Sequence, residues 1–255
     1  MNAAATPGFH ALILAGSRGG IDPVAAYAGV SHKALILLDG QTLLARVAQS
    51  LRQAGASTIA VSVSDDSVRA AATALGLTVL DAASGPSRSV RDGIEALGAP
   101  LLVTTADHAL LQPEWVTRFF ADVPVQADVG ALLARQDVIE AAAPGTRRTY
   151  LRFADGAWSG CNLFYFATPR SVAALDLWAQ VEADRKRPWR IVRRLGIGTL
   201  LRYLSGRLTL VAAIAHLGRL AGLDAAAVAS PFGLAAVDVD KPVDLDLVRT
   251  LVEHH

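Results

Sequence analysis

The sequence predicts an α/β fold in which a mostly parallel central sheet lies between two layers of helices. Short apolar runs of strand length alternate with segments of helical periodicity, in a repeated β-α-β-α order. A glycine-rich turn follows the first apolar run, as it does where a buried parallel strand leads into a ligand-binding loop. These observations predict a Rossmann-like, three-layer α/β/α architecture, with residues 1–255 forming a single domain.

Composition limits the class of protein. The chain has 255 residues, of which 52% are hydrophobic and 18% are charged, so it can bury a sizeable core and is not a disordered chain. Its single cysteine, Cys161, excludes an intramolecular disulfide framework and a cysteine-based zinc site. No run reaches the roughly 18 apolar residues of a membrane span, and no early segment resembles a secretory signal. We therefore expect a cytoplasmic protein.

The first half of the chain alternates regularly between the two element types. Glycines stand where the first two helices should stop, and an aspartate stands where an N-cap is expected for the second. A Ser-x-x-Asp pattern resembling a capping box opens the third helix at Ser89. Strands are predicted over 9–14, 57–63, 77–80 and 100–105, and helices over 42–54, 65–75, 89–97 and 112–120.

The second half continues the sheet and then becomes helical. Strands are predicted over 128–134, 150–153 and 159–166, the last two paired around a turn at 154–156, with an exposed loop over 141–148. Helices are predicted over 168–183 and 209–220, the second capped by Thr209. The chain should end with a strand over 234–239 and a helix over 243–252.

The glycine-rich turn is the first candidate for a ligand site. Backbone N–H groups of such a turn can approach an anion closely because glycine has no Cβ. Arg18 and Lys33 follow it and can neutralise phosphate charge, the first as a planar fork and the second as a point charge. We interpret the stretch as a triphosphate-binding loop, although many α/β proteins use similar turns only to join a strand to a helix. It contains neither Gly-x-Gly-x-x-Gly nor Gly-Lys-Ser/Thr, which disfavours a nicotinamide-dependent reductase and a P-loop ATPase.

Two aspartates follow predicted strands and are candidate metal ligands. Asp107 comes directly after the strand over 100–105, and Asp240 comes after the strand over 234–239. Carboxylates at the carboxyl ends of neighbouring strands could share one Mg²⁺, which prefers oxygen ligands and phosphate partners. The competing interpretation makes both residues helix caps, and we favour the metal for Asp107. His108 is left without a role.

Several small or polar residues are candidates for contacts with a nucleotide or its acceptor. The loop over 81–90 is rich in glycine and serine and could line a base or ribose pocket through Ser84, Gly85 and Ser89. Gly160 interrupts an apolar strand, which often marks close approach by another group. Asn162 could bind a substrate hydroxyl, and a structural hydrogen bond is nearly as plausible. The pair at 147–148 could be solvated or touch substrate.

A basic segment interrupts an otherwise acidic chain. Residues 185–223 carry nine basic side chains and no acidic one, together with tryptophan and leucine: Arg185, Lys186, Arg187, Arg190, Arg193, Arg194, Arg202, Arg207 and Arg219. We interpret 185–231 as a basic, helical insertion that covers the acceptor site. The same composition suits a helix lying on a membrane surface, so peripheral membrane contact stays open.

The order of these motifs resembles that of the MobA-like nucleotidyltransferases, within the glycosyltransferase-A-type (GT-A-type) nucleotidyltransferase superfamily. The resemblance covers 11–166 and 234–252. It is carried by Leu14-Ala15-Gly16 with Arg18 and Lys33, by Val103-Thr104-Thr105-Ala106-Asp107, by Gly160-Cys161-Asn162-Leu163, and by Asp238-Val239-Asp240-Lys241-Pro242-Val243-Asp244-Leu245.

The resemblance implies roles for individual residues. Arg18 and Lys33 would hold the triphosphate, and Asp107 with Asp240 would bind Mg²⁺. The acceptor would meet Asn162 and Gly160. The nucleotide would be bound by the first loop and by the glycine- and serine-rich loop, through Leu14, Ala15, Gly16, Ser17, Gly19, Ser84, Gly85 and Ser89.

The implied activity is magnesium-dependent transfer of a nucleoside monophosphate from a nucleoside triphosphate, with CTP or GTP favoured, to a phosphorylated small molecule or lipid precursor. Lys33, Arg18 and Asp107 would be the catalytic residues, and pyrophosphate would be released. The alternative is a catalytically inactive nucleotide-binding protein that contacts a membrane or a partner through 185–223. No nucleic-acid partner is expected, and the sequence leaves the oligomeric state open.

Overall fold

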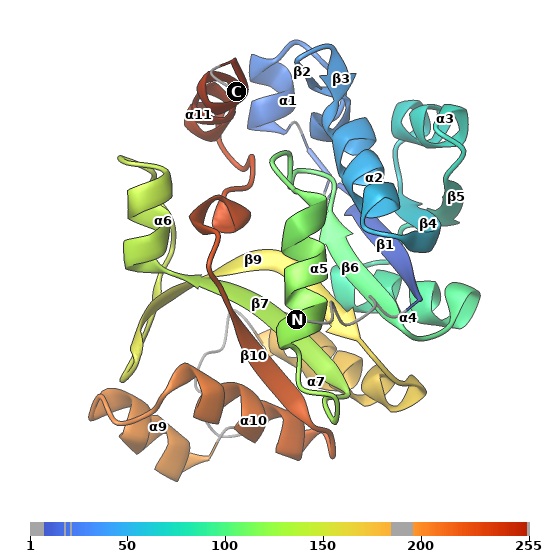
Figure 1. Cartoon of the computed structure of the whole chain (residues 1–255). Coiled ribbons are helices and arrows are strands. Elements are labelled where there is room, and N and C mark those ends of the chain that lie inside the picture. The colour runs from blue at the N-terminus through green and yellow to red at the C-terminus, as the bar shows by residue number, and fades with distance from the viewer. Residues whose placement is uncertain (1–7, 18, 21, 185–195, 254–255) are drawn as a thin grey trace, which may run out of the picture.

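The chain is described by a computed structural model that covers residues 8–17, 19–20, 22–184 and 196–253. The described residues form one eight-stranded sheet and a separate two-stranded hairpin. Figure 1 shows the large sheet at the centre of the molecule, with helices packed against it. Seven strands lie in the order β10-β7-β9-β6-β1-β4-β5, and β8 pairs with β9 at the margin. The large sheet consists of β1 (Phe9–Ala15), β4 (Ala56–Val63), β5 (Thr78–Asp81), β6 (Leu101–Thr105), β7 (Val129–Arg135), β8 (Leu151–Phe153), β9 (Gly156–Phe166) and β10 (Ala225–Ser230).

Strand β1 lies in the middle of the parallel part of this sheet. It pairs in parallel with β4 on one side and with β6 on the other, and β4 continues in parallel to β5. Strand β9 runs antiparallel between β6 and β7, and β10 pairs in parallel with β7. The mostly parallel sheet that the sequence predicted is therefore confirmed. Because β1, β4 and β6 point the same way, their carboxyl ends meet at one edge of the sheet.

Helices cover both faces of the sheet. Successive residues of β1 point to opposite faces: Leu12 packs with α4 and α7, whereas Ile13 belongs to the larger core cluster with α2 and α5. Helix α10 packs on the sheet through Leu210, which forms a cluster with Leu133 of β7 and Trp158 of β9. The helices are α1 (Pro23–Tyr27), α2 (Leu43–Gln53), α3 (Asp66–Ala74), α4 (Pro86–Leu97), α5 (Pro113–Asp122), α6 (Gln136–Ala142), α7 (Val172–Asp184), α9 (Ile197–Leu204), α10 (Leu210–Leu220) and α11 (Pro242–Glu253).

Shorter elements connect these layers. Three single turns of 3₁₀ helix, η1 (Lys33–Leu35), η2 (Pro169–Ser171) and η3 (Gly233–Ala236), and the small hairpin of β2 (Leu37–Leu38) and β3 (Gln41–Thr42) lie between the larger elements of the described chain. Two helices begin where the sequence places a residue whose side chain can cap the helix N-terminus. The Asp65 carboxylate accepts from the Val68 N–H, and the Thr209 hydroxyl accepts from the Ala212 N–H, so both predicted caps are confirmed.

The sequence prediction was wrong about the last strand. Residues 234–239 form no strand; the chain there passes through η3 and then leads directly into α11. The strand is β10, inside the segment that we predicted to be helical. Its alanine-rich sequence favours helix by propensity, but small side chains let the strand lie close to α10. A Cβ at Gly218 of α10 would come within 2.8 Å of Ala225, so packing decides the outcome.

Two smaller predictions also need correction. Helix α4 begins at Pro86 with Gly85 as its N-cap, so Ser89 lies inside the first turn and forms no capping box. Its buried hydroxyl instead accepts from the Ala83 N–H at 3.0 Å and holds the preceding loop against the helix. Residues 141–148 are only partly an exposed loop, because α6 ends at Ala142 and the side chain of Arg148 is only 8% exposed.

Candidate active site

Three segments that are distant in the sequence are tied together at the carboxyl edge of the sheet. The Leu14 carbonyl at the end of β1 accepts from the Ala106 N–H at 3.0 Å. The Asp107 carbonyl accepts from the Val239 N–H at 3.1 Å, which brings in the chain that precedes α11. These backbone hydrogen bonds fix the position of Asp107 between β1 and the C-terminal segment.

The side chains of Lys33, Asp107 and Asp240, here called the Lys33 cluster, meet at this edge. The Lys33 ammonium donates to Asp107 Oδ2 and, at 3.3 Å, to Asp240 Oδ1. Burial acts to lower the pKa of Lys33, but the neighbouring carboxylates outweigh it and hold the pKa above its ordinary value. The structure therefore brings these three predicted residues together, with a cation between two carboxylates.

The donor set suits Mg²⁺ bound together with a nucleotide. Oxygen Oδ1 of Asp107 is buried and has no hydrogen-bond partner, so it keeps its lone pairs for another group. Asp240 is 58% exposed and can be reached from solvent. Among the described residues, no group of three His, Cys, Asp or Glu side chains could hold a metal by itself. Mg²⁺ commonly takes one or two carboxylates and completes its shell with water and phosphate oxygens, so two aspartates are sufficient.

The glycine-rich turn follows β1 beside this cluster. Gly19 and Gly20 adopt positive φ of 78° and 89°, which favour glycine. The exposed Ser17 is held by Ser64, at the end of β4, through its N–H and its hydroxyl at 3.3 Å each. Leu14 and Ala15 end β1, and Arg18 lies outside the described residues.

The second predicted loop lies against the first. A Cβ on Gly16 would stand 3.3 Å from the Ala82 side chain, so the absence of a side chain at Gly16 allows the two loops to approach closely. Ser84 is exposed and Gly85 is the N-cap of α4, so both belong to a loop that borders the glycine turn. The structure thus brings together the two loops that the sequence assigned to the nucleotide.

Asn162 belongs to a network around Asp238 that the site prediction missed. It adopts a positive φ of 50° in β9, and its Nδ2 donates to Asp238 Oδ2 at 2.7 Å. The Arg148 guanidinium donates to the other oxygen of the same carboxylate. Burial raises the pKa of Asp238, the neighbouring Asp240 raises it further, and Arg148 opposes both effects. Asp238 therefore orients the amide that was predicted to bind the acceptor.

Arg148 also fixes the start of α11. Its Nη2 donates to the Asp238 carbonyl at 2.7 Å and lies 3.5 Å from Asp244 Oδ1. The other Asp244 oxygen accepts from the N–H groups of Asp240 and Lys241, at 3.2 and 2.9 Å. Arg148 thus connects the segment after α6 to the segment that carries Asp240. The sequence offered one signal for this network: Asp238 and Asp240 stand two residues apart, a spacing that places side chains on one face of an extended chain.

Gly160 and His108 are the remaining residues that the sequence analysis singled out. Gly160 pairs with Leu133 in the sheet, and a Cβ there would meet nothing within 4 Å, so no part of the described protein makes the close approach inferred from this glycine. His108 is fully buried, its Nδ1 lies 3.2 Å from the Thr104 hydroxyl, and burial lowers its pKa to about 4. It is therefore a neutral core residue at ordinary pH.

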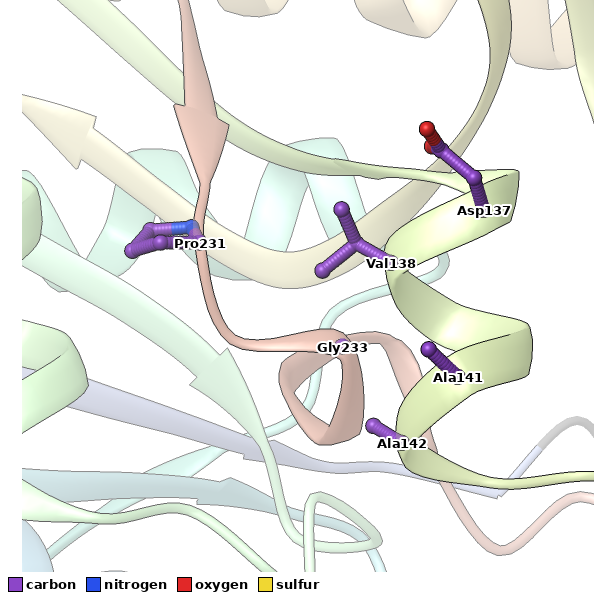
Figure 2. A pocket seen from close by; sticks show the side chains of 6 residues that line it. All are labelled: Asp137, Val138, Ala141, Ala142, Pro231 and Gly233. Carbon is purple, nitrogen blue, oxygen red and sulfur yellow. The ribbon is translucent and has the colours of Figure 1, made fainter.

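A shallow hollow lies between α6 and the chain that joins β10 to η3. Figure 2 shows Val138 and Ala142 on the side of α6 that faces this chain. Gly233 permits the approach, because a Cβ there would come within 2.2 Å of the Val138 carbonyl oxygen. The lining residues include no member of the Lys33 cluster: they are Asp137, Val138, Ala141, Ala142, Pro231 and Gly233.

Comparison with known families agrees with the fold. The sequence model described as the MobA-like NTP transferase domain matches residues 11–198, which include both loops, Lys33 and Asp107. The fold and this match define a nucleotidyltransferase. More specifically, the chain belongs to the MobA-like NTP transferase family, as its motifs predicted. Among curated proteins, none matches the chain.

Solved structures show the same fold. A hypothetical transferase from Thermus thermophilus is 30% identical, with a TM-score of 0.78, and the alignment covers 93% of this chain and 99% of that one. A nucleotidyl transferase from Methanothermobacter thermautotrophicus is 18% identical, with a TM-score of 0.57 and coverage of 97% and 99%. A CMP:2-keto-3-deoxy-manno-octonic acid synthetase, complexed with CTP, is 17% identical, with a TM-score of 0.58 and the same coverage. The last two likenesses concern the fold alone.

Proposed function

We propose that this protein catalyses magnesium-dependent transfer of a nucleoside monophosphate from a nucleoside triphosphate to a phosphorylated acceptor. The observation that carries the proposal is the Lys33 cluster beside the glycine-rich turn. Its ammonium group can bind phosphate oxygens, and the free oxygen of Asp107 with the accessible Asp240 can hold a cation. A nucleotide's phosphates are bound by a lysine ammonium group, by backbone N–H groups and by a metal ion that carboxylates hold, and this edge offers all three kinds of group.

The chemistry needs no protein nucleophile. An oxygen of the acceptor's phosphate attacks the α-phosphorus and forms a new P–O bond. The bond from that phosphorus to the bridging oxygen breaks, and its electron pair leaves with pyrophosphate. The protein positions both substrates and neutralises charge, with Lys33 on the phosphates and Asp107 and Asp240 as ligands for Mg²⁺. When bound, Mg²⁺ stabilises the negative charge of the phosphates.

The same edge of the sheet would bind both the nucleotide and the acceptor. CTP or GTP is favoured, with the base against the backbone of the two loops that meet at Gly16 and Ala82. One structural neighbour was solved with CTP, which makes cytidine the first base to test. The acceptor, a phosphorylated small molecule or lipid precursor, would contact Asn162, whose amide nitrogen is already held by Asp238.

The Lys33→Ala variant tests the catalytic arrangement. Pyrophosphate release should be measured with each of the four nucleoside triphosphates, Mg²⁺ and a panel of phosphorylated acceptors. We expect the variant to lose roughly three orders of magnitude in kcat, because a phosphate-binding charge is removed. Its unfolding transition should stay two-state. Arg118→Ala is the matched control, since Arg118 is exposed on α5 and pairs with Asp122. Turnover that survives Lys33→Ala would refute the role of this lysine.

The Asp107→Ala variant tests the metal. Without this carboxylate, activity should no longer respond to Mg²⁺, because the partnerless oxygen that we assign to the cation is gone. Asp122→Ala, on the exposed face of α5, is the matched control. An undiminished magnesium response would remove Asp107 from the metal site. If the wild type binds nucleotide but releases no pyrophosphate with any acceptor, the catalytically inactive alternative is the better description.

A further inference from the structure

Exposed apolar side chains gather on α9 and α10, at one margin of the molecule. Figure 1 shows both helices at the lower edge of the fold, with α9 at the periphery. Helix α9 contains no buried residue, although it is strongly apolar on one side. The exposed large hydrophobic residues of the two helices are Ile197, Leu201, Tyr203, Leu204, Val211 and Leu220.

The apolar residues of α9 share one face. Ile197, Leu201 and Leu204 are spaced four and three residues apart and are 72%, 59% and 70% exposed. The helix is held to the protein elsewhere: Tyr203 packs edge-on against Phe153 of β8, with ring centroids 5.7 Å apart. We call the three aliphatic residues the α9 face. Although the helix is fixed in this way, the α9 face is exposed on the surface of the described protein.

The charged side chains of α9, of α10 and of the turn between these helices have one sign. Arg202 and Arg207 are exposed in and just after α9, and Arg219 is exposed in α10. The described stretch 196–223 contains no acidic residue. The partner must therefore be both apolar and anionic. A second copy meeting this surface across a two-fold axis would place like charges opposite one another, which disfavours self-association.

We propose that the α9 face docks on an anionic membrane surface, with its aliphatic side chains in the interface and its arginines at the headgroups. Leucine and isoleucine on one side of a helix with arginine beside them are the composition of an interfacial helix. A nucleic acid would use the arginines but would leave the aliphatic residues exposed to water. The helix would lie on the bilayer, because in the described part of the chain no helix is long and apolar enough to cross one.

Vesicle flotation tests this proposal with the full chain. The protein should float with phosphatidylcholine vesicles that contain phosphatidylserine, and binding should weaken as salt is raised. The double variant Leu201→Glu, Leu204→Glu should lower the partition coefficient roughly tenfold or more, since it removes apolar contact and adds like charge to the headgroups. Each of Arg202→Glu and Arg207→Glu should lower it by about fivefold or more.

Matched controls separate this surface from general effects. Val125→Glu places the same charge at a fully exposed apolar position in the turn between α5 and β7 and should leave flotation unchanged. Circular dichroism and the unfolding midpoint should be unaltered in all variants because every substituted side chain is exposed. Pyrophosphate release without vesicles should also be unaltered, so failure of this proposal is distinguishable from failure of the proposed catalytic function.

Three results would overturn the proposal. The first is wild-type protein that does not float with anionic vesicles. The second is equal binding to neutral and anionic vesicles without salt dependence. The third is a wild-type dimer in analytical ultracentrifugation that Leu201→Glu dissociates, which would assign the α9 face to a second copy of the chain.

Discussion

Replacing Arg148 by alanine should destabilise the protein more than any surface substitution. The Arg148 side chain is 8% exposed and forms ion pairs with Asp238 and Asp244. The side chains of these two aspartates are 18% and 7% exposed. Its removal would leave two largely buried carboxylates without their cation. Breaking a buried ion pair from one side costs about 3–5 kcal/mol, because the remaining charge is buried and unpaired. Arg148→Lys should lose part of this stability, since an ammonium group cannot reproduce the forked contacts with the carboxylate and the carbonyl of Asp238.

Urea unfolding followed by circular dichroism measures this loss. The neighbouring Arg147 is exposed, so Arg147→Ala is the matched control and should change the free energy of unfolding by about 0.5 kcal/mol or less. The difference between Arg148→Ala and the wild type should shrink at acidic pH, because burial raises the pKa of Asp238 and its protonated carboxyl group no longer needs a cation. A loss of less than about 1 kcal/mol at neutral pH would refute the reasoning, because it would mean that the carboxylates are solvated or paired elsewhere.

Two further predictions concern the core around the site. Acidification should destabilise the fold, because His108 stays neutral when folded, with a pKa of about 4, but gains a proton when unfolded. The stability is present above the ordinary histidine pKa near 6.5 and is lost as the pH falls toward 4, by up to about 3 kcal/mol. Urea unfolding at several pH values should show this slope, and His108→Gln should flatten it. Gly233→Ala should lower the thermal midpoint, at a cost of about 2 kcal/mol or more, because the new Cβ meets the Val138 carbonyl. Gly160→Ala, which meets nothing, should leave the midpoint nearly unchanged; equal midpoints in both variants would contradict the packing argument.

Much of the fold could be predicted from the sequence because local signals and tertiary packing agree. The caps at Asp65 and Thr209 lie where their side chains can accept N–H groups, and the apolar strand β1 is buried on both faces. Prediction failed where packing overrides propensity. The alanines of β10 form a strand because Gly218 allows α10 to approach them closely, a contact that the local sequence does not reveal.

The candidate site was predictable in part for a topological reason. Asp107 ends a parallel strand beside the glycine-rich turn, so the fold class alone predicted that they would meet. Lys33 and Asp240 were assigned to the same site because the order of the motifs resembles that of the family. The link between Arg148 and Asp238 spans 90 residues and joins a loop to a helix start, so no local pattern could indicate it. The roles of these side chains in binding and catalysis stay predictions until the variants are measured.

The hydrogen bond from the Val239 N–H to the Asp107 carbonyl has a consequence for biosynthesis. All described strands of the large sheet precede Asp240 in the chain, so the sheet can assemble on the ribosome before Asp240 and α11 have emerged. A nascent chain that already displays the glycine-rich turn and Lys33 therefore lacks one of the two carboxylates beside that lysine. The proposed site is therefore complete only after the segment before α11 has been translated.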